Sequence, residues 1–347
     1  MACDSLEDEK LVDISITHTL PENEWRRFVD EHPQSNVFHT PEMFQVFSRV
    51  KGHQPELWAA TESERVLALL LPVRVTVFTG LLHFFTTRAV AYGSVLYAPG
   101  HRGREALNLL LRTYTREAGK MSLFTELRNL SNMEATQSLL RGNGFVYEDH
   151  LNYLIALRRP PEVILQGIGH RTRTHIRRGL RRGEVTVHNI TEREQVTNCY
   201  KLLYQTYRRA RTFLADQSLF EAAFDLLYSK GMVRFTMAHV AHAPVAVSVD
   251  LIYKDVIYGW YAGVDRSYST YRPSELLLWH MLRWGAENGY RVFDFGGAGK
   301  PDKKYGVRDF KSKFGGELVC CGRNLYVHSQ MLLRLSRLGY HLLRKWL

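Results

Sequence analysis

The sequence of 347 residues predicts an α/β (α+β) protein made of two similar mixed units, and three observations support this. Apolar runs rich in β-branched and aromatic residues alternate with helical patterns along the chain. The order strand, loop, helix, strand occurs twice, each time with a Tyr-Gly pair in the first strand, Tyr92-Gly93 and Tyr258-Gly259. A double proline, Pro160-Pro161, separates the two occurrences and favours a boundary between them.

The first unit begins with a strand at 11–19 and a capped helix at 21–33, in which Trp25 and Phe28 share one face. A second helix is expected from about Pro41. Strands follow wherever β-branched and aromatic residues are dense, at 57–63, 65–78 and 83–97. The unit ends with a helix at 104–119, a strand at 122–129 and a hairpin-like region that closes near 151–159.

The second unit repeats this alternation with longer helices. Helical periodicity predicts helices at 170–183, 193–211, 219–231 and 274–289. Short runs of β-branched and aromatic residues predict strands at 184–190, 233–240, 244–253, 255–264 and 291–297. Each unit is therefore expected to be a mixed sheet, mostly antiparallel and flanked by helices, and a ligand site is expected between the units.

Charge and cysteine content restrict the class of protein. The formal net charge is +11, which favours acidic partners such as nucleic acid, phosphorylated substrates or an anionic membrane surface. The four cysteines show no CxxC spacing, and neither HExxH nor paired Cys/His spacing occurs, so no metal is expected. The N-terminus is acidic rather than a secretory signal, and no apolar run reaches the roughly 20 residues that span a membrane. A cytoplasmic location is expected.

Residues 293–319 concentrate backbone freedom and positive charge in one segment. It holds six glycines in this order: Gly296, Gly297, Gly299, Gly306, Gly315 and Gly316. Five lysines lie among them: Lys300, Lys303, Lys304, Lys311 and Lys313. Glycines permit close backbone approach, and clustered lysines favour an anionic or developing negative partner, so the segment is expected to carry a site.

Several motifs together resemble the FemABX family of double-GNAT-fold transferases, which is grouped with the BioF-like acetyltransferase domains. The most specific are DFGG at 294–297 and the run Y-G-V-x-x-F-K-x-x-F-G-G at 305–316. Pattern-level matches lie at 36–47, at the basic helix and strand 170–187, and at 204–210. The resemblance implies two tandem GNAT-like domains, at 1–160 and 161–325, with a basic amphipathic helix at 326–347.

The same resemblance implies an enzyme of the N-acyltransferase class that moves an acyl or aminoacyl group onto an amine. Family members act in bacterial cell-envelope and peptidoglycan metabolism, with aminoacyl-tRNA as donor, while relatives use thioesters of CoA or a carrier protein. No tightly bound cofactor and a monomeric chain are expected. The alternative is a non-catalytic module on the same scaffold that binds RNA or a membrane surface through its basic charge.

The resemblance places Lys311, which follows Phe310, at the reaction centre, where a fixed cation would stabilise the negative charge that builds on the carbonyl oxygen. A solvated surface lysine is the alternative. Asp294 ends an apolar strand beside glycines, so it could orient the amine, act as base, or accept turn N–H bonds. Four neighbouring or matching positions complete the expected substrate site: Tyr261, Gly296, Gly297 and Lys313.

Arginines outside this segment are candidate anion contacts. Arg209 matches the family's arginine on the substrate-binding helix. Arg173, Arg177 and Arg178 lie on the basic helix and could track tRNA phosphates, or could form a solvated face. One departure from the family weakens the assignment of a peptidoglycan precursor, because Phe47 stands where peptidoglycan-type members have a phosphate-binding lysine. The pyrophosphate-binding loop of CoA-dependent GNAT enzymes is not found, so the motifs do not favour CoA as donor.

Residues 327–347 have helical periodicity with an apolar stripe and basic flanks. The stripe consists of Leu332, Leu335, Leu338 or Leu342, and Trp346, and the charge comes from Arg334, Arg337, Arg344 and Lys345. Two interpretations remain open. The helix could dock on the second domain, or it could lie on anionic lipid and hold the protein at the inner face of the membrane.

Overall fold

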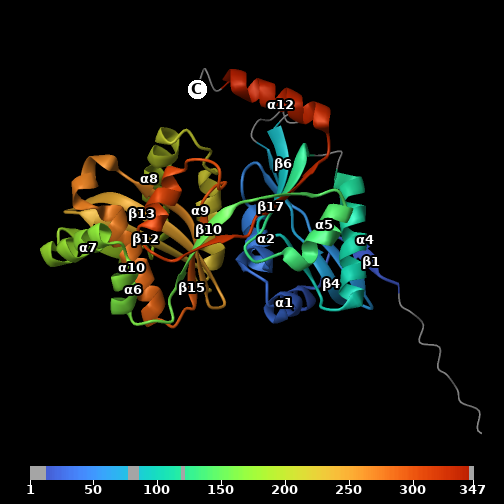
Figure 1. The fold of residues 1–347 in the computed structure, drawn as a ribbon, viewed down its shortest axis with the longest axis horizontal. Helices are drawn as coiled ribbons and strands as arrows, with labels where there is room; N and C mark the ends of the chain where they lie inside the picture. The colour runs from blue at the N-terminus through green and yellow to red at the C-terminus, as the bar shows by residue number, and fades with distance from the viewer. Residues whose placement is uncertain (1–12, 77–85, 119–121, 344–347) are drawn as a thin grey trace, which may run out of the picture.

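The computed structural model describes residues 13–76, 86–118 and 122–343, with side chains described as far as Ser336. Two lobes lie side by side, and two strands cross between them (Figure 1). Within the described residues no helix is long and apolar enough to cross a membrane.

The first lobe contains two sheets flanked by helices, whereas a single sheet was expected from the sequence. One sheet has the order β1-β3-β4-β7, formed by Ser15–Thr17, Trp58–Glu62, Arg65–Leu70 and Val95–Tyr97. The other has the order β2-β5-β6-β8-β17-β9, formed by His53–Pro55, Val73–Thr76, Thr87–Ala91, Phe124–Arg128, Arg323–Val327 and Val146–Glu148. The helices are α1 (Glu22–Glu31), α2 (Pro41–Ser48), α4 (His101–Ala118) and α5 (Gln137–Gly142).

The second lobe is built on one sheet of seven strands in the order β11-β12-β13-β14-β15-β10-β16. The strands are Val185–Asn189, Val233–Val240, Ala243–Tyr253, Val256–Val264, Val292–Gly297, Leu151–Ala156 and Glu317–Cys320. Apolar residues of α8 (Val196–Arg209) and α9 (Gln217–Leu227) cover one face, and those of α6 (Pro161–Gly167), α7 (His170–Arg182) and α10 (Pro273–Glu287) cover the other. A short helix, α11 (Gly306–Ser312), follows β15.

The two lobes exchange strands. β10 precedes the second lobe in sequence yet lies between β15 and β16, and β17 follows the second lobe yet lies between β8 and β9. Sheet membership therefore does not follow the expected boundaries at 160 and 325. Pro160 and Pro161 do not form a linker either, because Pro160 is the N-cap of α6 and Pro161 its first residue, a position where the missing N–H costs no hydrogen bond.

The tandem arrangement expected from the repeated pattern is confirmed. In the first lobe β6 and β8 are parallel and joined through α4, and in the second β14 and β15 are parallel and joined through α10. The tyrosines of the two Tyr-Gly pairs meet at one side chain, because the rings of Tyr92 and Tyr258 both lie 5.5 Å from the ring of Phe38. The two equivalent points of the fold thus face each other across the junction.

The lobes share a hydrophobic core, and hydrogen bonds and an ion pair join them at its edges. Buried side chains from α2 and β5 of the first lobe pack with those from α8, α9, β12 and β13 of the second. Lys254, in the turn between β13 and β14, donates to the carbonyls of Val29 and His32 at the end of α1. Lys230 pairs with the buried carboxylate of Glu42 at 2.8 Å. These contacts hold the lobes in one relative position.

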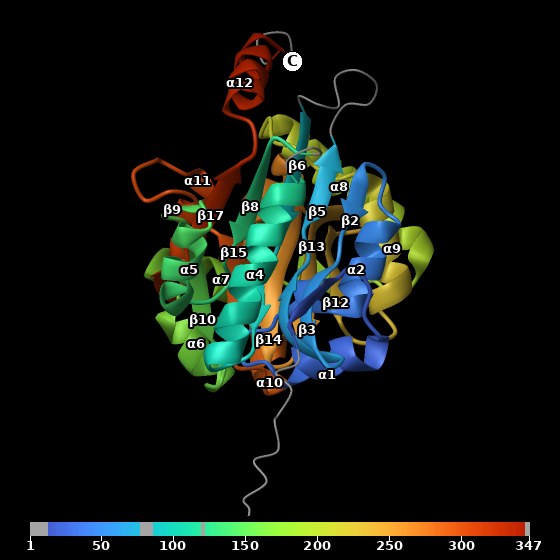
Figure 2. The ribbon, with the colours of Figure 1, turned by 90° about the vertical axis from the view of Figure 1, so that its right-hand side faces the viewer.

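The last helix, α12 (Gln330–Leu343), extends from β17 and lies beyond the end of the first lobe's sheet, near β6 (Figures 1 and 2). None of its described side chains, which end at Ser336, belongs to the hydrophobic core of the second lobe. Leu333 is buried, whereas Met331 is 70% and Leu335 48% exposed. The remaining members of the expected stripe, Leu338, Leu342 and Trp346, lie outside the described side chains, as do Arg337, Arg344 and Lys345.

Candidate functional site

The candidate site lies where β14 and β15 separate. The two strands pair in parallel only from Val256↔Val292 to Tyr258↔Asp294, and beyond this point β14 remains paired with β13 alone and β15 with β10 alone. The backbone of Gly296 has a φ of 68°, and a side chain there would start 3.1 Å from Tyr258 Oη and 3.2 Å from the carbonyl oxygen of Gly259. The turn therefore requires glycine.

Lys311 reaches this turn from α11 and is only 8% exposed. Its Nζ donates to the carbonyl oxygens of Phe295, Gly296 and Gly297 at 2.5, 3.1 and 2.8 Å. All three donors of the ammonium group are thus satisfied by the end of β15. Burial lowers the pKa of Lys311 to about 8, against the opposing effect of Asp294. The ammonium is a buried charge, which excludes the interpretation of Lys311 as a solvated surface lysine.

Asp294 lies on the same turn and is 4% exposed. Its Oδ1 accepts the backbone N–H of Gly296 at 2.7 Å and Nδ2 of Asn152 at 3.3 Å, whereas Oδ2 has no hydrogen-bond partner among the described residues. Burial raises the pKa of Asp294 to about 6, although the two hydrogen bonds and Lys311 act in the opposite direction. The carboxylate therefore both forms the turn and keeps one oxygen available as a base.

Lys311 and Asp294 are both buried at this turn and each affects the pKa of the other, although no ion pair joins them among the described contacts. Between about pH 6 and pH 8 the carboxylate is ionised and the amine is protonated, given the two pKa values. Such a pair supplies a proton acceptor and a fixed positive charge at one place, which acyl transfer to an amine requires. A buried carboxylate with a raised pKa beside a charge partner is also typical of functional sites.

Tyrosine hydroxyls extend the site along β14. Tyr261 packs edge-on against Phe220 at 4.9 Å and lies 5.8 Å from the ring of Tyr207. Burial raises the pKa of Tyr258 and of Tyr261, and that of Tyr207 to about 12. None of these hydroxyls has a hydrogen-bond partner among the described residues, so they are available to a substrate. The sequence indicated Tyr261, but Tyr207 carried no signal beyond its helical spacing.

Three expected site residues, one from the reaction centre and two from the substrate site, do not join Lys311 through their side chains. Phe310 packs on Phe314 with ring centroids 5.3 Å apart, which anchors α11 in the core. The side chain of Lys313 is exposed, and its backbone carbonyl accepts the N–H of Gly169. Arg209 is exposed at the end of α8 and donates to the carbonyl of Val264 at 3.2 Å, at the far end of β14. Gly297 does belong to the site, because its carbonyl binds Lys311.

The basic helix α7 lies at the outer end of the second lobe, away from the junction (Figure 1). Arg173 donates to the carbonyls of Gln166 and Ile168 and so caps the C-terminus of α6. Arg177 and Arg178 are exposed and form no ion pair within the described part of the chain. Of the three arginines predicted to contact tRNA, only these two are available to a ligand.

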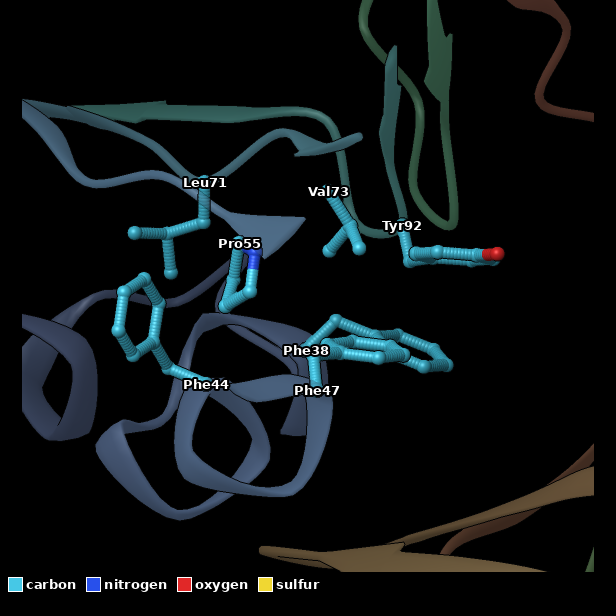
Figure 3. A pocket seen from close by; sticks show the side chains of 7 residues that line it. All are labelled: Phe38, Phe44, Phe47, Pro55, Leu71, Val73 and Tyr92. Atoms are coloured by element: carbon cyan, nitrogen blue, oxygen red, sulfur yellow. The ribbon is translucent and has the colours of Figure 1, made fainter. Parts of the chain in front are cut away.

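Phe47, at the position of the family's phosphate-binding lysine, lies in an aromatic stack. It is 4% exposed and stacks on Tyr92 at 5.3 Å. Beside it is a cavity of about 10 Å³, lined by Phe38, Phe44, Phe47, Pro55, Leu71, Val73 and Tyr92 (Figure 3). The Tyr92 hydroxyl points away from it (Figure 3). A cavity of that size holds about one water molecule and no acyl group, so this part of the first lobe serves packing.

Comparison with known proteins agrees with this geometry. Residues 170–311 match the family model of the acetyltransferase (GNAT) domain, which includes both Asp294 and Lys311. No curated protein matches the sequence.

The fold of the whole chain matches solved structures of low sequence identity. FemX is 16% identical with a TM-score of 0.70, and the match covers 92% of this chain and 99% of FemX. L-PGS from Bacillus licheniformis is 12% identical with a TM-score of 0.58, covering 93% and 98%. A tandem GNAT protein from the clavulanic acid biosynthesis pathway is 10% identical with a TM-score of 0.56, covering 91% and 99%. Residues 170–311 thus match the acetyltransferase (GNAT) domain model, and the chain as a whole has a fold similar to that of FemX.

Proposed function

We propose that this protein transfers an acyl or aminoacyl group from an activated donor to an amine. The observation that carries the proposal is the buried pair of Asp294 and Lys311 at the point where β14 and β15 separate. The two residues lie within the segment that matches the GNAT domain. A bacterial cell-envelope acceptor is part of the proposal, because the motifs at 294–297 and 305–316 resemble those of a family that acts there.

In the proposed reaction the amine nitrogen attacks the carbonyl carbon of the donor. Oδ2 of Asp294 accepts the proton that the attacking nitrogen loses, since this oxygen has no other partner in the described structure. The new C–N bond forms while the C–O bond of an ester donor, or the C–S bond of a thioester, breaks. The proton then passes from Asp294 to the leaving oxygen or sulfur, which restores the carboxylate.

Lys311 would act through its charge and through the backbone that it fixes. Its three donors are already used by carbonyls, so direct donation to the developing oxyanion requires one of these bonds to open. The positive charge of Lys311 remains effective over a few ångströms in a buried site. The same bonds hold Phe295, Gly296 and Gly297 in the turn that places Asp294.

The donor is decided by a direct assay with two arms. The purified chain is incubated with an amine acceptor pool and with either a mixture of aminoacyl-tRNAs or acyl-CoA, and release of free tRNA or free thiol is measured. Acyl transfer with either donor supports the proposal. Binding of tRNA or of vesicles without turnover in any arm would instead establish the alternative, a non-catalytic binding module on the same scaffold.

We favour aminoacyl-tRNA as the donor, because Arg177 and Arg178 are exposed and unpaired. Binding of tRNA should then weaken steeply with salt, and replacing both by Gln should reduce the log–log slope by about 1 to 2. The matched control is the double change of Arg116 and Arg141 to Gln, two exposed arginines of the first lobe. Equal slopes for the two variants would refute this contact, and tRNA binding that ignores salt would favour a thioester donor.

The proposal also places the chain, as a monomer, in the cytoplasm at an anionic membrane face that α12 contacts. The exposed Met331 and Leu335 would enter the lipid, with Arg334 at the headgroups. Changing Met331 and Leu335 to Ser should abolish co-sedimentation with phosphatidylglycerol vesicles, whereas Leu180→Ser, at an equally exposed apolar residue of α7, should not. Full-length protein that ignores these vesicles at low salt would refute the contact. A truncated variant that lacks α12 must end at Ser329 or later, because β17 is needed in the six-stranded sheet of the first lobe.

A further inference from the structure

A second charged cluster faces the junction from the first lobe. Residues alternate between the two faces of a strand, so Glu126 and Arg128 of β8 share one face, and their ladder partners place Arg323 of β17 on it as well. Leu127, on the opposite face, packs in the core beneath α4. Val90 of β6 is the ladder partner of Glu126, and Arg88 lies two residues before Val90, so Arg88 is on the same face as Glu126. Three arginines and one carboxylate therefore point toward the second lobe.

Glu126 fixes two of these arginines. Its Oε1 accepts Nε of Arg128 at 2.5 Å and Nη1 of Arg323 at 2.9 Å. Burial alone would raise the pKa of Glu126, but the charges of Arg128 and Arg323 lower it to about 2. Nη2 of Arg323 lies 2.9 Å from Nε2 of His150, and burial together with Arg323 lowers the pKa of His150 to about 4, so this histidine is neutral. One carboxylate thus accepts hydrogen bonds from two guanidinium groups, so the cluster keeps a net positive charge.

The terminal nitrogens of Arg128 are free to bind a ligand. Neither Nη1 nor Nη2 of Arg128 has a hydrogen-bond partner among the described residues, and the group instead lies 4.9 Å from the ring centre of Tyr92. The side chain keeps 30% exposure, against 26% for Arg323. The guanidinium is held at Nε, so its two outer nitrogens form a preset fork, the geometry that matches a carboxylate or a phosphate.

This cluster adjoins the reaction centre. A Cβ on Gly297 would lie 2.9 Å from Nε2 of His150 and 3.7 Å from Nη2 of Arg323, while the carbonyl of the same glycine binds Lys311. Arg323 and Lys311 therefore lie against one residue of the turn. Arg128 and Asp294 both lie close enough to Tyr258 to affect its pKa, which Asp294 raises and Arg128 lowers. A molecule bound at Arg128 would reach Asp294 past Tyr258.

We propose that Arg128, held by Glu126 and supported by Arg323, binds an oxyanion of the substrate, a carboxylate or a phosphate group. The assignment to a substrate rests on the proposed acyl transfer, but binding of the anion does not. In that reaction the site would hold the charged end of the acceptor while its amine lies at Asp294.

The test is calorimetric titration of the full chain with inorganic phosphate and, separately, with acetate, at an ionic strength held constant with chloride. One binding event per chain is expected in at least one arm, and the arm with the lower Kd identifies the anion. Arg128→Gln should raise that Kd at least tenfold, because the fork is lost while Glu126 remains paired with Arg323. Arg141→Gln, at an exposed arginine of α5, should leave the Kd unchanged.

A second measurement needs no variant. The wild-type chain is labelled with ¹⁵N-arginine, and the side-chain resonance of Arg128 is identified as the one absent from the Arg128→Gln spectrum. Titration with the anion should shift this resonance with the same Kd as the calorimetry gives. If the variant does not fold, the expected result is that a single arginine resonance of the wild type shifts and saturates. No saturable binding in either arm, or an equal Kd for wild type and Arg128→Gln, would overturn the inference. Anion binding without acyl transfer would leave it standing and refute the proposed function alone.

Discussion

Lys311→Met is expected to lower turnover by about two to three orders of magnitude with the fold retained, the range typical of removing one preorganised electrostatic group from an active site. The variant removes a buried positive charge and leaves the carbonyls of Phe295, Gly296 and Gly297 without their donor. A loss of about 1–3 kcal/mol in unfolding free energy should accompany it, because buried acceptors are left unsatisfied. Steady-state kinetics and thermal unfolding of the same preparation measure both effects.

The control for this variant is Lys201→Met, at an exposed lysine of α8, which should change neither quantity. Normal turnover of the Lys311 variant with the correct donor and acceptor would remove this residue from the mechanism. Unfolding of the variant at ambient temperature would assign it a structural role only, as the tie between α11 and β15.

Asp294→Asn should reduce kcat/KM by about two to four orders of magnitude, since the proton acceptor is lost while the bond from Gly296 can still be accepted by the amide oxygen. The wild-type profile of kcat/KM against pH should be a bell. Activity requires the Asp294 carboxylate and so rises through about pH 6, and it requires the Lys311 ammonium and so falls through about pH 8. The variant should lose the acidic limb and keep the basic one.

Asp309→Asn is the matched control, because Asp309 is an exposed carboxylate of α11. It should reproduce the wild-type profile in both height and shape. An Asp294 variant that keeps its acidic limb would show that another group is the base, and an unchanged rate would limit Asp294 to forming the turn.

The parts of the fold that depend on local pattern could be predicted from the sequence. Helical periodicity located the helix at 274–289, which the structure places at Pro273–Glu287, and the repeated Tyr-Gly pairs identified equivalent points of the two lobes. Asp294 and Lys311 could be singled out because a glycine-rich turn and a family motif surround them. That they form a buried pair required the structure, because it depends on how α11 packs on the end of β15.

Non-local pairing could not be predicted in the same way. Nothing in the residues of β10 or β17 states which sheet they will join, because an apolar strand fits either neighbour and the choice is made by contacts far along the chain. Arg128 was missed for a related reason. A single arginine in the strand at 122–129 resembles a solvated side chain until Glu126 and Arg323 are seen beside it. Lys313 and Arg209 were selected by motif position, and packing directs them elsewhere.

The strand exchange has a consequence for how the chain is made. β17 lies inside the six-stranded sheet of the first lobe, between β8 and β9. A growing polypeptide therefore cannot complete this sheet until residue 327 has left the ribosome. Until then β8 presents an unpaired edge, which is the feature that invites wrong pairing and aggregation. β10, made early, must likewise wait for β15 and β16. The two lobes therefore reach their native state together, and neither is an independent folding unit although each resembles a complete domain.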